Sequence, residues 1–289
     1  MKIITRKKGN QKYFYLRHSI RQGPKIINEE IYLGKKIPKN IELIKQKLKA
    51  NAKKEMYKKL EKIKNHFQEE WKRYPESMKK KEMEEIAISF TYNTNAIEGS
   101  TITLEEVREI TQENLSPNKS IRDVKETEAH YKTFLRMINK KEKISNKLLL
   151  RWHKEIFNET KEDISGKFRD YFVRVGNYIA PDWQDLPKLM REFINFTNET
   201  ILNPVELAAR IHYRFEKIHP FGDGNGRIGR LLMNWVLWYN GYPMLIIEYK
   251  KRKSYYRALQ KIEDDFVSYF LRRYFFINKN RLKQIINKK

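Results

Sequence analysis

"IHPFGDGNGRIGR", residues 218–230, decides how this chain folds and what chemistry it carries. The stretch places four glycines, one histidine, one carboxylate, one asparagine and two arginines between two segments with helical periodicity. Before it, apolar residues lie three or four positions apart, the pattern of one buried helical stripe: Ala208, Ile211, Phe215 and Ile218. A second helical pattern begins near Asn225. The sequence therefore predicts a glycine turn that leads from one helix directly into the next.

Two common nucleotide-binding loops are weighed first. Gly224, Gly226 and Gly229 satisfy the spacing G-x-G-x-x-G, and Glu248 follows about 20 residues later. That loop must follow a strand, whereas residues 204–218 read as a helix and strands do not alternate with helices along the chain. No Lys-Ser or Lys-Thr follows the glycines, so a Walker loop is excluded as well.

A glycine turn that opens a helix is a site for an anion, because the first amides of the helix lack partners and glycine lets phosphate approach the backbone. Arg227 and Arg230 are three residues apart, so both can project from one helical face toward a polyphosphate. Asp223 is a hard oxygen ligand of the kind that Mg²⁺ prefers. His219 can accept a proton from an attacking hydroxyl. Each residue alone would suit a cap or a surface ion pair, but together they indicate phosphate chemistry.

"HPFGDGNGRIGR", residues 219–230, resembles at every defining position the signature of the Fic family, His-Pro-Phe-x-Asp/Glu-Gly-Asn-Gly-Arg-x-x-Arg. The resemblance extends over residues 83–289 and implies a mainly α fold, a helical Fic core with a small β-hairpin flap. Most members transfer AMP from ATP to a protein hydroxyl. The resemblance therefore implies an ATP- and Mg²⁺-dependent protein adenylyltransferase acting on Ser, Thr or Tyr of a target protein. A de-AMPylating or bifunctional enzyme is the alternative within the same site, and a small subset of the family moves other phosphate-containing groups.

The same resemblance implies roles for single residues. His219 is the catalytic base that deprotonates the target hydroxyl, and Asp223 is the Mg²⁺ ligand. The phosphates are bound by the amides and guanidiniums that follow: Gly224, Asn225, Gly226, Arg227 and Arg230. These roles agree with the chemistry read from the residue types, in which positioning and charge stabilisation dominate.

Two further stretches resemble parts of the nucleotide site. "VRVGNYIAP", residues 173–181, resembles the Fic flap, a hairpin that covers the site and pairs with an extended target segment by strand addition. Its residues implied to touch ATP are Val175, Gly176, Asn177 and Tyr178. "KSYYRAL", residues 253–259, resembles the helix beside the adenosine and places Tyr255 and Tyr256 near the base or ribose. Adjacent tyrosines are also common in ordinary amphipathic packing.

"TNAIEG", residues 94–99, resembles the inhibitory motif Ser/Thr-x-x-x-Glu-Gly/Asn of autoinhibited Fic proteins, with Thr94, Glu98 and Gly99 at its defining positions. This resemblance implies an inhibitory helix over about residues 83–99 in the same chain. Glu98 is then expected to pair with Arg230 and to occupy the guanidinium that the γ-phosphate needs. From the residues alone, an exposed glutamate before a glycine cap remains the alternative.

Charge and composition bound the partners and the compartment. The 289 residues include 61 Lys and Arg against 36 Asp and Glu, a formal net charge of +25. Residues 1–82 alone hold 25 against 9, a net charge of +16, which indicates an acidic partner. Without cysteine there are no disulfides and no cysteine-bound metals. No apolar run approaches the roughly 18 residues of a membrane span, so we expect a cytoplasmic protein with no membrane association.

Three regions are predicted along the chain. Residues 1–37 form a basic β-hairpin, with strands inside residues 12–34 around a Gly-Pro turn. Residues 38–82 form a lysine-rich helical connector, and residues 83–289 form the Fic catalytic domain. Within that domain a capping box opens a helix at Thr103–Glu106, a short hairpin lies in residues 168–181, and further helices span 121–139, 146–157, 185–197, 204–218, 226–240 and 252–285.

The N-terminal charge supports a second hypothesis, a regulator that binds nucleic acid through residues 1–82. Tyr13, Phe14 and Tyr15 are interleaved with basic residues there, although hairpin packing would also account for them. The partners expected from the sequence are thus a target protein bound along the flap, nucleic acid at the N-terminal region, and a second copy of the chain in a homodimer.

Overall fold

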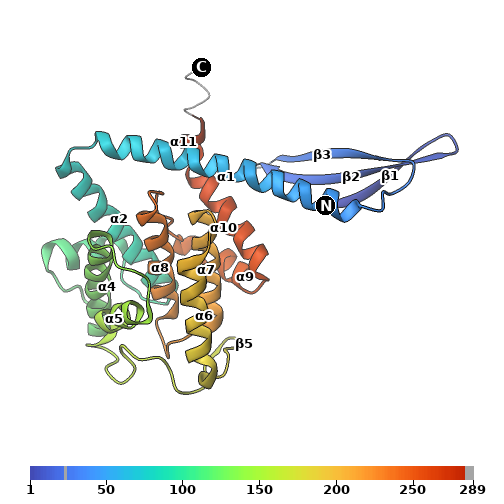
Figure 1. Cartoon of the computed structure of the whole chain (residues 1–289). Coiled ribbons are helices and arrows are strands. Elements are labelled where there is room, and N and C mark those ends of the chain that lie inside the picture. Colours follow the sequence, from blue (N-terminus) through green and yellow to red (C-terminus); the bar gives the residue numbers. More distant parts are fainter. Residues whose placement is uncertain (23–24, 284–289) are drawn as a thin grey trace. The chain divides into compact units, whose positions relative to one another are not determined.

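The computed structural model describes residues 1–22 and 25–283, and the side chains of residues 18–29 lie outside this description. The chain divides into two compact units. The first comprises Met1–Lys62 with the described residues from Phe275 onward, and the second comprises Ile63–Tyr274. Figure 1 shows the elements of both units.

The first unit contains a three-stranded antiparallel sheet in the order β1-β2-β3, formed by β1 (Lys2–Lys8), β2 (Gln11–Gln22) and β3 (Lys25–Gly34). The hairpin expected within residues 12–34 is confirmed as β2 and β3, whereas β1 was not predicted. Its sequence KIITRKK contains too few apolar residues to show alternation. The Gly-Pro turn expected at residues 23–24 lies outside the described residues.

The chain is otherwise mainly helical, as predicted. The helices in order are α1 (Ile41–Arg73), α2 (Glu76–Ile97), α3 (Leu104–Arg108), the π-helical turn η1 (Glu109–Glu113), α4 (Ile121–Asn139), α5 (Asn146–Phe157), the 3₁₀ turn η2 (Trp183–Asp185), α6 (Leu186–Glu199), α7 (Pro204–Ile218), α8 (Asn225–Tyr239), the 3₁₀ turn η3 (Tyr249–Lys251), α9 (Arg252–Leu259), α10 (Glu263–Ile277) and α11 (Lys279–Lys283). A hairpin of two-residue strands, β4 (Arg174–Val175) and β5 (Tyr178–Ile179), lies within the hairpin predicted at residues 168–181.

The helix predicted over residues 252–285 is wrong, because the structure has three helices there, α9, α10 and α11. The first turn of α10 carries three carboxylates in a row, Glu263, Asp264 and Asp265. Carboxylates are favourable at a helix N-terminus and unfavourable at a C-terminus, so they favour a new helix start over continuation of α9. The helices predicted over residues 121–139, 146–157, 185–197, 204–218 and 226–240 have the observed bounds or differ by one or two residues. The helix predicted over about residues 83–99 begins earlier than expected, because α2 already starts at Glu76.

The core of the second unit is organised around α7 and α8, which pack against each other. The predicted stripe on α7 is buried, with Ala208, Ile211 and Phe215 fully inaccessible. The glycine turn joins these two buried helices, and Phe221 in the turn is itself fully buried. Its ring stacks on His153 of α5, with centroids 4.0 Å apart and an interplanar angle of 12°. The turn is therefore anchored in the core rather than lying as a surface loop.

Helix starts in the second unit follow the expected chemistry. Thr103 and Glu106 form the predicted capping box: the Glu106 amide donates to Thr103 Oγ1 over 3.2 Å, and the Thr103 amide donates to Glu106 Oε2 over 2.7 Å.

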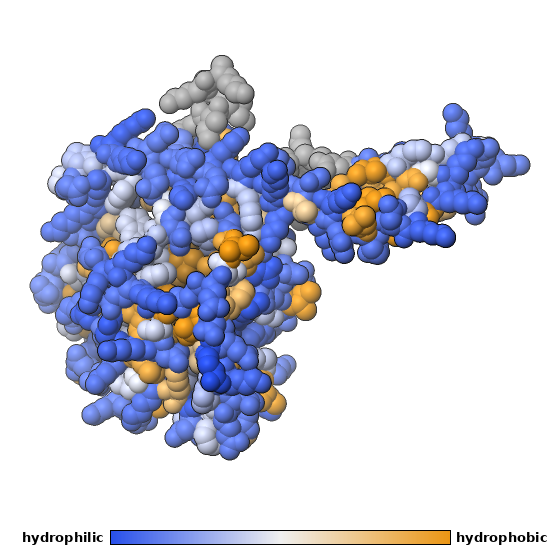
Figure 2. All heavy atoms as spheres, in the orientation of Figure 1, coloured by the Kyte–Doolittle hydropathy of each residue, from blue (hydrophilic) through white to orange (hydrophobic). Residues whose placement is uncertain are grey.

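Hydrophilic side chains cover most of the face of this unit seen in Figure 2. Within the described ranges, no helix combines the length and apolar character needed to cross a bilayer.

Gly224→Ala should destabilise the protein by roughly 2–4 kcal/mol, because two penalties add at this position. Gly224 has φ 80°, and a β-carbon there would overlap the buried ring of Phe157. Urea denaturation measures the loss. Gly99→Ala is the matched control, since Gly99 also has a positive φ of 98° but open space around it. An equal loss in both variants would contradict the role assigned to the Phe157 contact.

Candidate active site

His219 ends α7 in a left-handed backbone conformation, with φ 51° and ψ 60°. This conformation is uncommon for a residue other than glycine. Its Nδ1 lies 3.3 Å from the backbone carbonyl of Glu216. A carbonyl only accepts, so Nδ1 carries the ring proton in the neutral tautomer and Nε2 keeps a lone pair. Burial lowers the pKa of His219, so the ring is a neutral base at pH 7.

Arg169 links His219 to the segment that carries the flap. Its Nε donates to the carbonyl of His219 over 2.8 Å, and its two Nη atoms donate to the carbonyls of Tyr171 and Pro181 over 2.9 and 2.7 Å. Its backbone amide also donates to the carbonyl of Pro220 over 2.9 Å. The sequence analysis did not identify Arg169, because an isolated arginine between two motifs has no distinguishing pattern.

Two buried polar side chains hold the glycine turn from inside. Asn225 closes it by accepting from the Phe221 amide over 2.9 Å and donating to the Phe221 carbonyl over 2.8 Å. The Gly166 amide donates to Nδ1 of His153 over 2.9 Å, so His153 Nε2 carries the proton and donates to the Asp223 carbonyl over 3.0 Å. The turn is thus held in one geometry before any ligand arrives.

The turn presents the N-terminus of α8. The backbone amides of Asn225, Gly226 and Arg227 begin this helix, and such amides have no acceptor within their own helix. The amide of Gly224, also predicted to bind phosphate, donates here to the Asp223 carboxylate over 2.5 Å. The resulting group of oriented amides has the chemistry of an anion site, as expected from the sequence.

Asp223 and Arg227 belong to a buried charge network that the sequence did not reveal. Lys161 lies between two carboxylates, with Nζ 2.6 Å from Asp223 Oδ2 and 2.9 Å from Glu126 Oε1. Glu126 Oε2 in turn forms an ion pair with Arg227 Nη1. Glu126 is buried on α4, on the same face as His130 four residues later. A charged residue at a core-facing helix position could therefore have indicated Glu126 from the sequence. Lys161 lies in a loop, where no sequence pattern indicates its role.

These cations keep both carboxylates ionised. Burial would raise the pKa of Glu126, but the charge and hydrogen bond of Arg227, with Lys161, lower it to about 2. Burial would likewise raise the pKa of Asp223, and the Lys161 hydrogen bond and the Arg227 charge lower it to about 2. Arg227, predicted to bind phosphate, is only 5% exposed and is paired with Glu126. Its contact with a nucleotide stays a prediction.

The Mg²⁺ site implied by the sequence is compatible with this arrangement. Within residues 1–22 and 25–283, no three His, Asp or Glu side chains converge as a closed metal site. Asp223 is ionised and its side chain is 46% exposed, so it can supply one hard oxygen. Mg²⁺ is usually held by one or two carboxylates together with phosphate oxygens and water. The residues therefore fit a Mg²⁺ ion that arrives with a nucleotide.

Arg230, 1% exposed on α8, is bound by the end of α2. Its Nε donates to Thr94 Oγ1 over 2.6 Å, and Nη2 donates to Glu98 Oε1 over 2.5 Å. Burial would lower the pKa of this guanidinium, but the Glu98 carboxylate raises it. A β-carbon on Gly226 would overlap the Glu98 carboxylate, so that carboxylate lies against the first turn of α8. The contact between Glu98 and Arg230 expected from the sequence is present.

The site combines a histidine in a left-handed backbone conformation, a turn held by buried side chains, and two buried arginines on the following helix. These features lie within residues 143–237, which match the model of the Fic/DOC family. The chain belongs to this family. The match contains the histidine, the turn and both arginines, and it ends within α8.

Several curated proteins that are similar to this chain share the name protein adenylyltransferase Fic. The protein adenylyltransferase Fic of Nematostella vectensis is 34% identical over 201 residues, which cover 67% of this chain and 47% of that protein. The protein of the same name from Culex quinquefasciatus is 35% identical over 201 residues, covering 67% of this chain and 40% of the relative. This chain therefore spans less than half the length of the curated relatives it matches.

Solved structures share the fold. Fic-1 from C. elegans superposes with a TM-score of 0.70 at 24% identity, covering 86% of this chain and 77% of that chain. A Fic domain containing signaling protein from Bacteroides thetaiotaomicron superposes with a TM-score of 0.68 at 24% identity, covering 80% and 98% of the two chains. At this identity the likeness shows a common helical fold.

The two tyrosines predicted near the adenosine support the Fic site from different positions. Tyr255 is buried, and its hydroxyl lies 2.8 Å from His212 Nε2 and 3.4 Å from Arg230 Nη1. Tyr256 donates to the carbonyl of Ile97 over 3.0 Å, and its residue surface is 41% exposed. Tyr255 thus orients Arg230, while Tyr256 holds the end of α2. Their contact with a nucleotide stays a prediction.

The Fic flap presents exposed backbone. Val175, Gly176 and Asn177 are exposed, and Gly176 has φ 58° with open space around it. Tyr178 is held by its hydroxyl, which donates to the carbonyl of Lys217 over 2.5 Å. Lys217 also places its Nζ 4.4 Å above the Tyr178 ring. One strand of the flap is thus attached to α7 two residues before His219.

Gly99 follows the end of α2, in the segment predicted to be inhibitory. It has φ 98°, and its amide donates to the carbonyl of Ala96 over 3.1 Å. The α2 helix therefore stops directly after Glu98, which leaves that carboxylate at a helix end beside Arg230.

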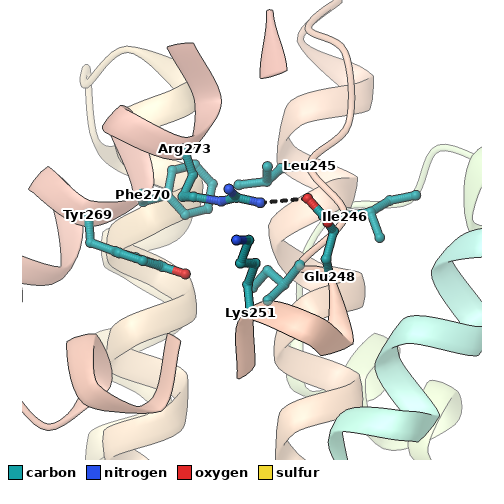
Figure 3. Close-up of a pocket in the computed structure, with 8 residues that line it drawn as sticks. Leu245, Ile246, Glu248, Lys251, Tyr269, Phe270 and Arg273 are labelled. Carbon is teal, nitrogen blue, oxygen red and sulfur yellow. Dashed lines mark hydrogen bonds and ion pairs between the residues drawn. The ribbon is translucent and has the colours of Figure 1, made fainter. Parts of the chain in front are cut away.

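A small pocket lies elsewhere in the second unit, lined by Leu245, Ile246, Ile247, Glu248, Lys251, Tyr269, Phe270 and Arg273 (Figure 3). It shares no residue with the Fic site. Two of its charged groups bind each other, with Arg273 Nη2 2.8 Å from Glu248 Oε1. The residues of the Fic signature lie at the α8 N-terminus, which is the candidate active site.

Glu216 is a carboxyl group in the Fic site that the sequence motifs do not include. Its side chain is 14% exposed, and Oε1 lies 4.0 Å from His212 Nε2, beyond hydrogen-bond distance. Burial raises its pKa to about 7, although Arg230 acts in the opposite direction. Its protonated form is therefore populated in the folded protein up to about pH 7.

The ionisation of Glu216 should make stability depend on pH. Because the folded pKa is above the unfolded value of 4.5, its stabilising contribution is complete below pH 4.5 and is lost as pH rises through about 7. Between pH 5 and 8 the wild type should lose roughly 2–3 kcal/mol relative to Glu216→Gln. Urea denaturation of both proteins at the two pH values measures the difference. Parallel pH profiles would show that Glu216 has an ordinary pKa.

Proposed function

We propose that this chain is a protein adenylyltransferase that transfers AMP from ATP to a Ser, Thr or Tyr hydroxyl of a target protein and is inhibited by its own α2 helix. One observation carries the proposal: a neutral histidine and a buried arginine flank the N-terminus of α8, and a carboxylate of the same chain is bound to that arginine. The names of the relatives support the activity.

The proposed reaction needs a base, a phosphate site and an open route for the target. The target hydroxyl oxygen forms a bond to the α-phosphorus of ATP, and the bond from that phosphorus to the oxygen bridging the β-phosphate breaks. Pyrophosphate leaves, and the hydroxyl proton passes to Nε2 of His219. The hydrogen bond of Nδ1 to the Glu216 carbonyl keeps Nε2 unprotonated before the reaction.

Binding of the triphosphate is assigned to the start of α8. Its free amides and the guanidinium of Arg230 supply positive charge where negative charge builds up during transfer. Asp223 would hold Mg²⁺, which when bound neutralises phosphate charge and orients the oxygens. Because Asn225 and His153 hold the turn rigidly, little reorganisation is needed when the nucleotide binds.

Inhibition is proposed to be a competition for Arg230. The guanidinium is buried and can pair strongly with one anion at a time, either the Glu98 carboxylate or a phosphate oxygen. The carboxylate also occupies the space next to Gly226 at the α8 N-terminus. ATP can therefore bind productively only when Glu98 leaves, which makes the end of α2 the regulatory element.

Glu98→Gly should raise AMP transfer by tenfold or more, because removal of a directly competing charge is worth at least about 1.4 kcal/mol in a buried site. Incorporation of label from α-labelled ATP with Mg²⁺ measures this, in self-modification and with candidate targets. The double variant Glu98→Gly/His219→Ala should lose the gain.

Glu82→Gln is the matched control, since it removes an exposed carboxylate from the same helix away from Arg230. It should label like the wild type. Equal labelling by Glu98→Gly and the double variant would contradict the proposed base. Release of AMP from a labelled target by the wild type, but not by Glu98→Gly, would favour the de-AMPylating alternative.

The pH profile should report the His219 base. Burial lowers the pKa of His219, and the nearby Glu98 carboxylate acts to raise it, so removal of Glu98 lowers it further. In Glu98→Gly, kcat/KM should therefore stay high below pH 6.5 and fall only at lower pH, as the ring becomes protonated. Steady-state labelling from pH 5 to 8 tests this. An acid limb centred at or above 6.5 would argue against a buried histidine base.

We also infer that residues 1–82 bind nucleic acid. Their net charge of +16 supports the inference. A salt-dependent gel shift with the full chain tests it.

A further inference from the structure

The sheet of the first unit has two faces of different chemistry. Strand register places Arg6 opposite Tyr13, and Tyr15 opposite both Ile4 and Tyr32. Directly opposite residues in an antiparallel pair project to the same side of the sheet. We use the term tyrosine face for this side of the sheet, whose members include Lys2, Ile4, Arg6, Tyr13, Tyr15, Arg17 and Tyr32.

The opposite face mixes apolar side chains with two lysines, Lys7 and Lys12, which pair across β1 and β2. Ile3 is paired with Leu16, and Leu16 is paired with Ile31 on the other neighbouring strand. Leu16 is fully buried, whereas Ile3 and Ile31 are partly exposed. Phe14 alternates onto the same side, which separates it from Tyr13 and Tyr15. The three tyrosines therefore do not lie on the face that contains Leu16.

The three rings of the tyrosine face lie close together but are tilted against each other, by 40° for Tyr13 and Tyr32 and by 49° for Tyr15 and Tyr32. The Tyr32 ring centroid lies 5.3 Å from Tyr15 and 6.3 Å from Tyr13. The Arg6 guanidinium lies 4.8 Å above the Tyr15 ring. Tyr32 remains 54% exposed, although it is a large aromatic residue in a three-stranded sheet. An exposed ring of this size, next to further rings and a guanidinium, is available to a planar ligand.

The surroundings of this face are strongly basic. Residues 1–37 contain ten Lys and Arg and only two Glu. One of these carboxylates, Glu30, binds both guanidiniums of the face, with Arg6 Nη2 at 2.7 Å and Arg17 Nε at 2.9 Å. It holds the two side chains in place beside the rings, and a large excess of positive charge remains around them.

We propose that the tyrosine face binds single-stranded nucleic acid, with bases stacked on Tyr13, Tyr15 and Tyr32 and phosphates bound by the surrounding basic side chains. Stacking on aromatic rings along a basic surface is the general mode of single-strand binding. Bases of a duplex are already stacked on each other and cannot reach exposed rings, so the tyrosines favour a single strand. The inference rests on the second proposal above and is independent of AMP transfer.

Fluorescence anisotropy with the full chain tests the proposal, using labelled oligonucleotides of about 15 nucleotides, a length set by typical single-strand sites. The probes are a deoxythymidine strand, a uridine strand and a DNA duplex of equal length. Tighter binding of either single strand than of the duplex is expected, and the two single strands distinguish DNA from RNA as the source. No binding at low salt, or a preference for the duplex, would overturn it.

Substitutions separate stacking from charge. Tyr32→Ala should weaken single-strand binding about fivefold or more, whereas Tyr32→Phe, which keeps the ring, should change it less than about twofold. Arg6→Gln should weaken binding more than Lys7→Gln, because Lys7 alternates onto the opposite face. Equal binding by Tyr32→Ala and wild type would overturn the stacking role. Circular dichroism checks that each variant keeps its folded structure.

A measurement on the unmodified protein avoids dependence on folding of the variants. Ultraviolet cross-linking to a bromouridine strand, followed by peptide mass spectrometry, should place adducts on Tyr13, Tyr15 or Tyr32. Adducts confined to the lysine-rich α1 would overturn the proposal. Binding is measured without ATP, and AMP transfer is assayed on the same preparations, so failure of one activity is distinguishable from failure of the other.

Discussion

The candidate active site depends on the buried guanidinium of Arg230 in the first turns of α8, because this cation requires a negatively charged partner. Arg230 is almost inaccessible to solvent, and an unpaired cation in such a position is strongly unfavourable. Thr94 and Tyr255 supply neutral acceptors, but the full positive charge requires an anion. In this structure the anion is Glu98. A ligand that displaced Glu98 would have to compensate for the loss of that carboxylate, so the proposed inhibition links ligand binding thermodynamically to release of α2.

The second arginine of the motif differs in the character of its partner. Arg227 pairs with Glu126, which is as deeply buried as the arginine itself and is also bound by Lys161. Glu98 is partly exposed and lies at the end of a helix. The partner of Arg227 is therefore part of the core, whereas the partner of Arg230 is accessible to solvent. The Arg227 pair stabilises the fold, while the Glu98 carboxylate on Arg230 is suited to replacement by another anion.

The sequence was sufficient to predict the elements that depend on local pattern. The helix before the turn and the capping box at Thr103 follow from periodicity and cap chemistry. The contact between Glu98 and Arg230 was implied by the resemblance to the inhibitory motif. Lys161 and Arg169 could not be found in this way, since Lys161 binds Asp223, 62 residues later, and Arg169 binds the carbonyl of His219, 50 residues later. Strand β1 was missed because its pairing with β2 stabilises it more than its own composition does.

The backbone conformation of His219 reduces the stability of the fold. Its left-handed backbone would be relaxed in glycine, so the chain maintains strain at the residue proposed to act as the base. Replacing the histidine can therefore leave a protein that folds more stably than the original while losing the base. Selection for folding alone would remove this histidine. Its presence indicates that the turn has been shaped by a requirement other than stability.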